Sequence, residues 1–129
     1  MTLRHLRLAF SLAAAVTALA VLAVTAAARP ASTHTLIGVT GKNNAFVITL
    51  KTTTGKLVKT LPPGTYTFVI HDDSAIHNYE LDGPHGKSWT FTGVGFTGTK
   101  TFTLKLVAGA YKAYCKIHEP TMFQRFTVT

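Results

Sequence analysis

The sequence contains a single cysteine, two methionines and only five acidic residues among its 129 positions. A lone cysteine cannot form an internal disulfide bond. The five acidic residues are outnumbered by thirteen lysines and arginines, which gives a formal net charge of +8. The lysines stand singly and mostly alternate with apolar residues, whereas a nucleic-acid-binding protein usually gathers its basic residues in a stripe with aromatic residues between them. We therefore expect no nucleic-acid partner.

Common enzyme signatures are also missing. The sequence has no G-x-S-x-G, Walker or H-E-x-x-H pattern. Charged residues make up only 14% of the chain and apolar residues 47%. This composition suits one compact globular domain and argues against disorder.

The N-terminus has the pattern of a secretory signal peptide. Arg4 and Arg7 precede a weakly apolar, alanine-rich run over residues 8–24, and the small residues at 26–28 provide a cleavage site. The sequence predicts a signal peptide over residues 1–28, a flexible mature N-terminus over 29–35 and one folded domain over 36–129. The alternative is an uncleaved membrane anchor, because residues 8–28 are just long enough to span a bilayer. A lone thiol in an exported protein is exposed to oxidation unless it is buried, ligated or paired between chains.

The exported part reads as short strands separated by turns. Residues 46–51, 66–70 and 101–106 alternate between apolar and polar side chains, and the first of these segments places Phe46, Ile48 and Leu50 on one face. Glycine and proline separate the segments, and no amphipathic helix follows the signal helix. We predict an all-β Greek-key β-sandwich of seven to eight strands. The motif L-x-x-G-x-Y, at residues 61–66 and 106–111, resembles the tyrosine corner of such sandwiches.

Three potential metal ligands lie within eight residues near the C-terminus: Cys115, His118 and Met122. Strand alternation turns Cys115 and Met122 inward, and it also turns His77 inward, on the face opposite Glu80. Two imidazoles, a thiolate and a thioether form a donor set that suits copper in an electron-transfer site. Each residue alone has an ordinary alternative: Cys115 as a buried apolar residue or an intermolecular disulfide, His118 as a solvated turn residue, and Met122 as core filler.

The other residues that could take part in binding or chemistry are assigned structural roles. His71 has the parity opposite to the apolar face of its strand, and His85 lies in a Gly-Pro loop. His34 lies near the mature terminus and is predicted to be disordered. Trp89 and Phe91 share a parity and are predicted to form a packed pair in the core.

The dipeptide His77-Asn78, followed by Y-C-x-x-H-x-x-x-M over residues 114–122, resembles the cupredoxins, and in particular small exported bacterial domains of plastocyanin or azurin type. The resemblance extends from about Leu36 to Thr129. It implies that Asn78 braces the cysteine loop by hydrogen bonding. It also implies one copper ion, cycling between Cu(I) and Cu(II), with four ligands: His77, Cys115, His118 and Met122.

The ligand loop departs from the family pattern in its spacing. Three residues separate His118 from Met122, where plastocyanin-like loops usually have four; azurin-like loops have three there but more between the cysteine and the histidine. Ile117 stands where many relatives carry a proline before the loop histidine. Gln124 has the parity of an alternative axial oxygen donor. We expect the identity of the ligands to survive these changes.

The resemblance implies a mononuclear blue-copper protein that acts as a one-electron carrier outside the cytoplasm: in the periplasm, in the extracellular space or on the outer face of the cytoplasmic membrane. We expect a monomer that docks through the edge of His118 and an apolar collar of Ile117, Pro120, Met122 and Phe123. The exported part has eleven basic and five acidic residues, so the partner should be an acidic redox protein, such as a cytochrome or an oxidase subunit. Contact with a membrane is expected only if the signal segment stays uncleaved.

The alternative function is a copper buffer, or a donor of copper to an enzyme, without a role in electron transfer. A donor usually displays several exposed methionines or histidines, whereas Met122 is the only methionine beyond the signal peptide. We expect no enzymatic activity, because multicopper oxidases and copper nitrite reductases need H-x-H or H-C-H patterns, which this sequence lacks.

Overall fold

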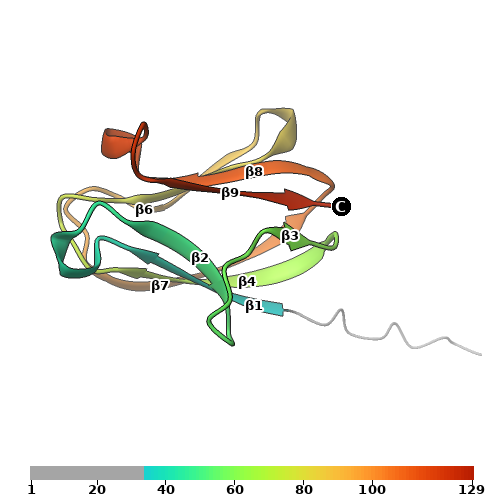
Figure 1. The fold of residues 1–129 in the computed structure, drawn as a ribbon, viewed down its shortest axis with the longest axis horizontal. Coiled ribbons are helices and arrows are strands. Elements are labelled where there is room, and N and C mark those ends of the chain that lie inside the picture. The colour runs from blue at the N-terminus through green and yellow to red at the C-terminus, as the bar shows by residue number, and fades with distance from the viewer. Residues whose placement is uncertain (1–33) are drawn as a thin grey trace, which may run out of the picture.

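The structure, a computed structural model, describes residues 34–129, which form two β-sheets packed face to face (Figure 1). The predicted signal peptide and residues 29–33 lie outside the described residues. Within residues 34–129 no helix has the length and apolar character needed to cross a membrane. Short 3-10 turns connect some of the strands: η1 (Lys42–Asn44), η2 (Pro84–Gly86) and η3 (Lys116–His118). The strands of the described part are β1 (His34–Thr40), β2 (Ile48–Thr52), β3 (Thr60–Leu61), β4 (Gly64–Asp72), β5 (Tyr79–Asp82), β6 (Ser88–Thr92), β7 (Gly98–Leu106), β8 (Gly109–Tyr114) and β9 (Phe123–Val128).

The predicted all-β sandwich is confirmed. One sheet has the order β2-β1-β4-β7 and the other β3-β9-β8-β5-β6. Both sheets are mixed, since β1 runs parallel to β4 and β3 runs parallel to β9. The nine strands of the described part exceed the predicted seven to eight by one. The two-residue β3 accounts for the difference, because an alternation of side chains cannot be recognised over two residues.

The core lies between the sheets and follows the predicted alternation. In β4 the side chains of Tyr66, Phe68 and Ile70 are buried, and the residues between them are half-buried. The Phe91 ring is buried and packs against Phe68, with 5.3 Å between ring centroids. Trp89 is partly buried and packs against the same core, as predicted for the pair.

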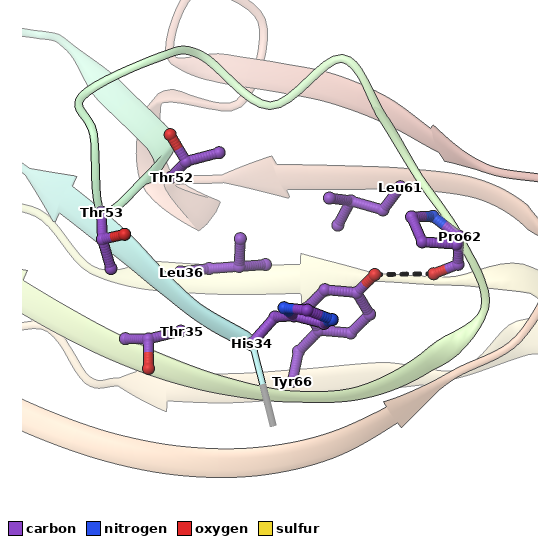
Figure 2. Close-up of a pocket in the computed structure, with 8 residues that line it drawn as sticks. All are labelled: His34, Thr35, Leu36, Thr52, Thr53, Leu61, Pro62 and Tyr66. Carbon is purple, nitrogen blue, oxygen red and sulfur yellow. Dashed lines mark hydrogen bonds between the residues drawn. The ribbon is translucent and has the colours of Figure 1, made fainter. Parts of the chain in front are cut away.

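Both L-x-x-G-x-Y motifs form tyrosine corners. The Tyr66 hydroxyl donates a hydrogen bond of 2.7 Å to the Pro62 carbonyl, four residues upstream (Figure 2). The Tyr111 hydroxyl donates to the Val107 carbonyl at 3.0 Å and accepts from the Val107 N–H at 3.1 Å. The sequence prediction is therefore confirmed at both positions, and each corner fixes the entry of the chain into a strand, β4 or β8.

One side chain joins the two sheets where their edges meet. The Gln124 amide oxygen accepts the Leu50 N–H at 2.8 Å, and its amide nitrogen donates to the carbonyls of Leu50 and Val58 at 3.0 and 2.9 Å. Both the oxygen and the nitrogen of this amide are thus hydrogen-bonded to backbone groups, those of Leu50 in β2 and of Val58 beside it. The alternative of Gln124 as an axial metal ligand is not supported, because its oxygen already accepts a hydrogen bond at the sheet edge.

The described chain begins at the end of the sandwich opposite η1 and η3 (Figure 1). His34 and Thr35 belong to β1 and pair in register with Tyr66 and Thr67 of β4. The prediction of disorder at His34 is therefore wrong: the parallel ladder to β4 and the contact of its ring with Tyr66, 5.8 Å between centroids, hold it in place. A cavity of about 280 Å³ opens beside these rings, lined by His34, Thr35, Leu36, Thr52, Thr53, Leu61, Pro62 and Tyr66 (Figure 2).

Candidate metal centre

Three side chains converge at the end of the sandwich that carries η1 and η3. The Nδ1 atoms of His77 and His118 lie 3.0 Å apart. The Cys115 sulfur lies 3.8 Å from Nδ1 of His77 and 3.7 Å from Nδ1 of His118. Two imidazole nitrogens and one thiol therefore form a small triangle, and these residues are separated by up to 41 positions in the sequence.

The triangle has the dimensions of a metal site. The point in its plane that is equidistant from the three atoms lies about 2 Å from each, which is the usual length of a bond between a transition metal and imidazole. His77 and Cys115 are 0% exposed, and His118 is half-buried. Nε2 of His77 is buried and has no hydrogen-bond partner among the described residues. Two imidazoles and a thiolate are the trigonal donor set that copper prefers in electron-transfer proteins, so the residues fit a copper ion.

Each of the three side chains lies in a short connection next to a strand. His77 lies two residues before β5, Cys115 directly follows β8, and His118 ends η3. The His77 N–H donates to the Ser74 carbonyl at 3.1 Å, and the His118 N–H donates to the Cys115 carbonyl at 3.1 Å. The sandwich positions the donors through these short connections, since each lies within four residues of a strand.

The short ligand loop is closed by its own backbone. The Cys115 N–H donates to the Met122 carbonyl at 3.1 Å, and the Met122 N–H donates to the His118 carbonyl at 2.8 Å. These bonds span the unusual three-residue interval between His118 and Met122 by a single tight turn. Met122 is 1% exposed and belongs to the hydrophobic core. Its side chain therefore contributes nothing to the exposed collar that the sequence predicts.

Asn78 connects the two parts of the chain that carry the donors. Its amide oxygen accepts the backbone N–H of Lys116 at 2.8 Å, next to Cys115. Its amide nitrogen donates to the Glu80 carboxylate at 2.9 Å. The geometry is that of a brace between the segment after His77 and the cysteine loop.

Glu80 occupies a different environment from the predicted one. Strand alternation places it opposite His77 and toward solvent, but the structure buries it beneath Tyr114. The Tyr114 hydroxyl lies 3.3 Å from the carboxylates of both Glu80 and Asp82. Burial, and then these two carboxylates, raise the pKa of the Tyr114 hydroxyl to about 12. A polar network thus covers the outer side of the cysteine strand, where sequence alternation indicates only water.

A second buried network supports the loop before His77. The Asp72 carboxylate accepts hydrogen bonds from the Thr92 hydroxyl at 2.6 Å and from the Ser74 N–H at 3.3 Å. The Thr92 oxygen also accepts the Tyr79 N–H at 2.8 Å. Desolvation by burial raises the pKa of Asp72. These bonds tie β4, β5 and β6 together at the place where the chain turns toward His77.

The predicted collar residues lie on the surface near the triangle. Ile117 and Pro120 are exposed in the ligand loop. Phe123, at the start of β9, is also exposed, and its ring packs beneath the Arg125 guanidinium and beside the Lys112 ammonium, 4.5 and 5.5 Å from the ring centroid. This side of the collar therefore carries positive charge.

Sequence reasoning missed Phe46. Alternation predicts an inward side chain, but β2 begins only at Ile48 and Phe46 is 54% exposed in the preceding loop. Its ring meets both imidazoles, with 5.1 Å to the His77 centroid and 4.5 Å to the His118 centroid. No sequence signal distinguishes this phenylalanine, because its contacts arise from the folding of one loop over another.

Comparison with known proteins identifies the architecture. No protein-family model matches the sequence, and no curated protein matches it. Among solved structures, one described as part of a study of two rusticyanin mutants shares 16% identity with this chain over 74% of its length and 76% of that chain, with a TM-score of 0.53. A structure described as the copper protein rusticyanin gives 16% identity, the same coverage and a TM-score of 0.51. Rusticyanin from Thiobacillus ferrooxidans gives 16% identity, the same coverage and a TM-score of 0.50.

Proposed function

From the premise that this chain has the cupredoxin fold, as its sequence motifs predict and its likeness to rusticyanin shows, we propose that it is a mononuclear blue-copper protein and a one-electron carrier outside the cytoplasm. The observation that carries the proposal is the buried triangle of His77, Cys115 and His118, whose edges of 3.0 to 3.8 Å suit one metal ion. Its place of action would be the periplasm, the extracellular space or the outer face of the cytoplasmic membrane. A catalytic role is not proposed.

In this proposal the three donors of the triangle would hold the ion, with Met122 as the fourth ligand. Bound copper supplies a one-electron couple between Cu(I) and Cu(II). The chain contributes a fixed arrangement of donors. The bond from the Lys116 N–H to Asn78 and the backbone bonds between Cys115 and Met122 resist movement of the loop. Little rearrangement on a change of charge is what rapid electron exchange requires.

Burial of the donors keeps water away from them. His77 and Cys115 are fully buried, so His118 is the ligand through which the site meets the surface. The exposed Ile117, Pro120 and Phe123 surround that approach and form the proposed docking collar. Arg125 beside Phe123 would attract an acidic partner, such as a cytochrome or an oxidase subunit. Small, transient contacts are expected of such a partner, with the carrier itself a monomer.

The copper-buffer or copper-donor function is less well supported by the site. A donor must release its ion readily, and it usually presents exposed sulfur ligands for the transfer. Here the cysteine is fully buried and the methionine nearly so. Reversible voltammetry separates the two functions: fast one-electron exchange favours the carrier, and slow exchange with ready loss of copper to a mild chelator favours the donor.

The primary test is a titration of the full chain with Cu(II). An intense thiolate-to-copper charge-transfer band should appear and saturate at one equivalent. Cys115→Ser should abolish the band. His85→Asn is a matched control, because His85 is exposed and adopts φ of 59°, a conformation that asparagine tolerates. Absence of the band in the parent chain, or its persistence in Cys115→Ser, would overturn the proposal.

A further inference from the structure

Phe46 contacts both candidate histidine ligands although it belongs to neither ligand-bearing segment. It lies in the loop between β1 and β2, and its ring stands edge-on to His77, at an interplanar angle of 81°, and to His118, at 69°. The two imidazoles also meet each other edge-on, with 4.9 Å between centroids. Three rings therefore form one cluster, and Phe46 is its outer member.

The loop that carries Phe46 is held in a conformation that most residues avoid. Gly41, Asn43 and Asn44 all have left-handed backbone angles, with φ of 67°, 56° and 58°. Such a run is retained only where the surroundings determine it. The Gly41 N–H donates to the Val47 carbonyl at 3.1 Å, and the Ser74 hydroxyl donates to the Asn44 side-chain oxygen at 2.7 Å. The position of Phe46 over the imidazoles is therefore built into the loop.

Phe46 contacts the one donor residue of the triangle that is not fully buried. His77 and Cys115 are fully buried, whereas His118 is half-buried. Release of an ion requires the His118 imidazole to turn away from the other two donors, since they cannot move without opening the core. The Phe46 ring, 4.5 Å from His118 between centroids, is a neighbour whose contact such a turn would disrupt.

We propose that Phe46 is a positioning residue for the metal centre: its ring holds the His118 imidazole toward the triangle, slows the loss of copper and keeps water from the metal. The inference rests on the proposed function, because it concerns the same site. It assigns to the β1–β2 loop the control of metal exchange. The ligands themselves come from two other segments of the chain.

The test compares Phe46→Ala with Val47→Ala in the full, copper-loaded chain. The two residues are adjacent and are 54% and 55% exposed, so the control removes a similarly exposed apolar side chain from the same loop. The rate of copper loss to excess chelator is followed by the charge-transfer band. Phe46→Ala should lose copper about 10- to 100-fold faster than the parent, if the loss of metal affinity typical of residues that support ligands falls on the rate of release. Val47→Ala should match the parent.

Two further measurements separate positioning from a general loss of structure. Water-proton relaxation by the Cu(II) form should increase in Phe46→Ala alone. In the metal-free chain, NMR relaxation of the His118 ring should report greater mobility in Phe46→Ala than in Val47→Ala. If Phe46→Ala does not fold, Phe46→Leu, which retains apolar volume but lacks the ring edge, should show an acceleration smaller than tenfold but above that of Val47→Ala.

Parent-like copper retention and ring mobility in Phe46→Ala would overturn the inference, as would equal acceleration in Val47→Ala. If only Phe46→Leu folds, copper retention equal to that of Val47→Ala would also overturn the inference. These results leave the proposed function standing. A parent chain that develops no charge-transfer band overturns the proposed function itself, and the mobility of the metal-free His118 ring then still decides whether Phe46 positions that imidazole.

Discussion

Replacing Gly41 by alanine should place a methyl group where the structure has room for none. A Cβ atom at this position would lie 2.5 Å from Cβ of Ser74 and 2.8 Å from Cδ2 of His77. Both neighbours are buried parts of the loop that carries the candidate metal-binding imidazole. Neither is the free end of a flexible side chain, so the methyl group can be accommodated only if the loop or the imidazole moves.

The expected cost has two parts. Gly41 has φ of 67°, and a residue with a Cβ atom in the left-handed region costs about 1–2 kcal/mol. Overpacking of a close contact typically costs a further 1–3 kcal/mol or so. The free energy of unfolding should therefore fall by about 2–5 kcal/mol, a large share of the roughly 5–15 kcal/mol that stabilises an ordinary domain.

Gly55→Ala is the matched control for this prediction. Gly55 has φ of 82°, but a Cβ atom there would meet nothing within 4 Å. It bears only the conformational part of the cost, so the difference between the two variants isolates the contact with Ser74 and His77. The assay is urea denaturation of the metal-free chain, followed by the fluorescence of Trp89, the only tryptophan. Copper retention should decrease in Gly41→Ala and stay at the parent value in Gly55→Ala.

Equal losses of stability in the two variants would refute this reasoning. Such a result would mean that the β1–β2 loop yields easily, and that its left-handed residues are not held against His77. Normal copper retention in a destabilised Gly41→Ala chain would refute the expected effect on the metal site, because the methyl group would then displace the loop without disturbing the imidazole.

Four side-chain interactions outside the triangle also have expected effects. Asn78→Ala leaves the Lys116 N–H without its acceptor and should lower the free energy of unfolding in urea by about 1–3 kcal/mol. Tyr66→Phe removes one tyrosine-corner hydrogen bond and should cost about 1 kcal/mol, seen as a lower Tm by calorimetry. The Lys112–Glu119 ion pair is partly exposed, so a double-mutant cycle to alanine should give a coupling of at most about 1 kcal/mol, which decreases at high salt. The pKa of Tyr114 is about 12 in the folded chain, whereas that of a tyrosine in the unfolded chain is 10.0. The free energy of unfolding should therefore fall as pH rises from 10 to 12, because the unfolded chain loses this proton first. Tyr114→Phe should lessen this fall, as measured by urea denaturation at each pH.

The parts of the site that follow a local rule could be predicted from the sequence. Cys115 directly follows a regular strand, so alternation gives its direction correctly. The spacing to His118 brings its nitrogen within reach of the same point through one short turn. The two tyrosine corners are likewise local, since each hydroxyl bonds to a residue four positions upstream. Such features depend on short segments whose conformation their own residues determine.

The parts that depend on contacts between loops could not be predicted. Phe46 lies outside a strand, and the alternation that assigns it an inward direction does not apply there. Glu80 lies on the outer face of its sheet, where a carboxylate normally meets water, but Tyr114 from the neighbouring strand covers it. Gln124 has an inward parity, yet its amide is hydrogen-bonded to the backbone at the edge of β2. In each case the environment comes from a segment distant in sequence.

Hydrogen bonds cross between loops at the end of the sandwich that carries the candidate metal centre. Ser74 and Asn44 join the loop before His77 to the β1–β2 loop, and Asn78 and Lys116 join the start of β5 to the cysteine loop. Since each loop is bonded to another, a donor cannot move alone, and displacement of one imidazole must disturb two connections. The left-handed backbone near Gly41 is retained for the same reason, because relaxing it would break the hydrogen bond from Ser74 to Asn44, and the Ser74 carbonyl also accepts the His77 N–H. Preorganisation of the candidate copper site is therefore a property of the three connected loops, and the ligand residues alone do not provide it.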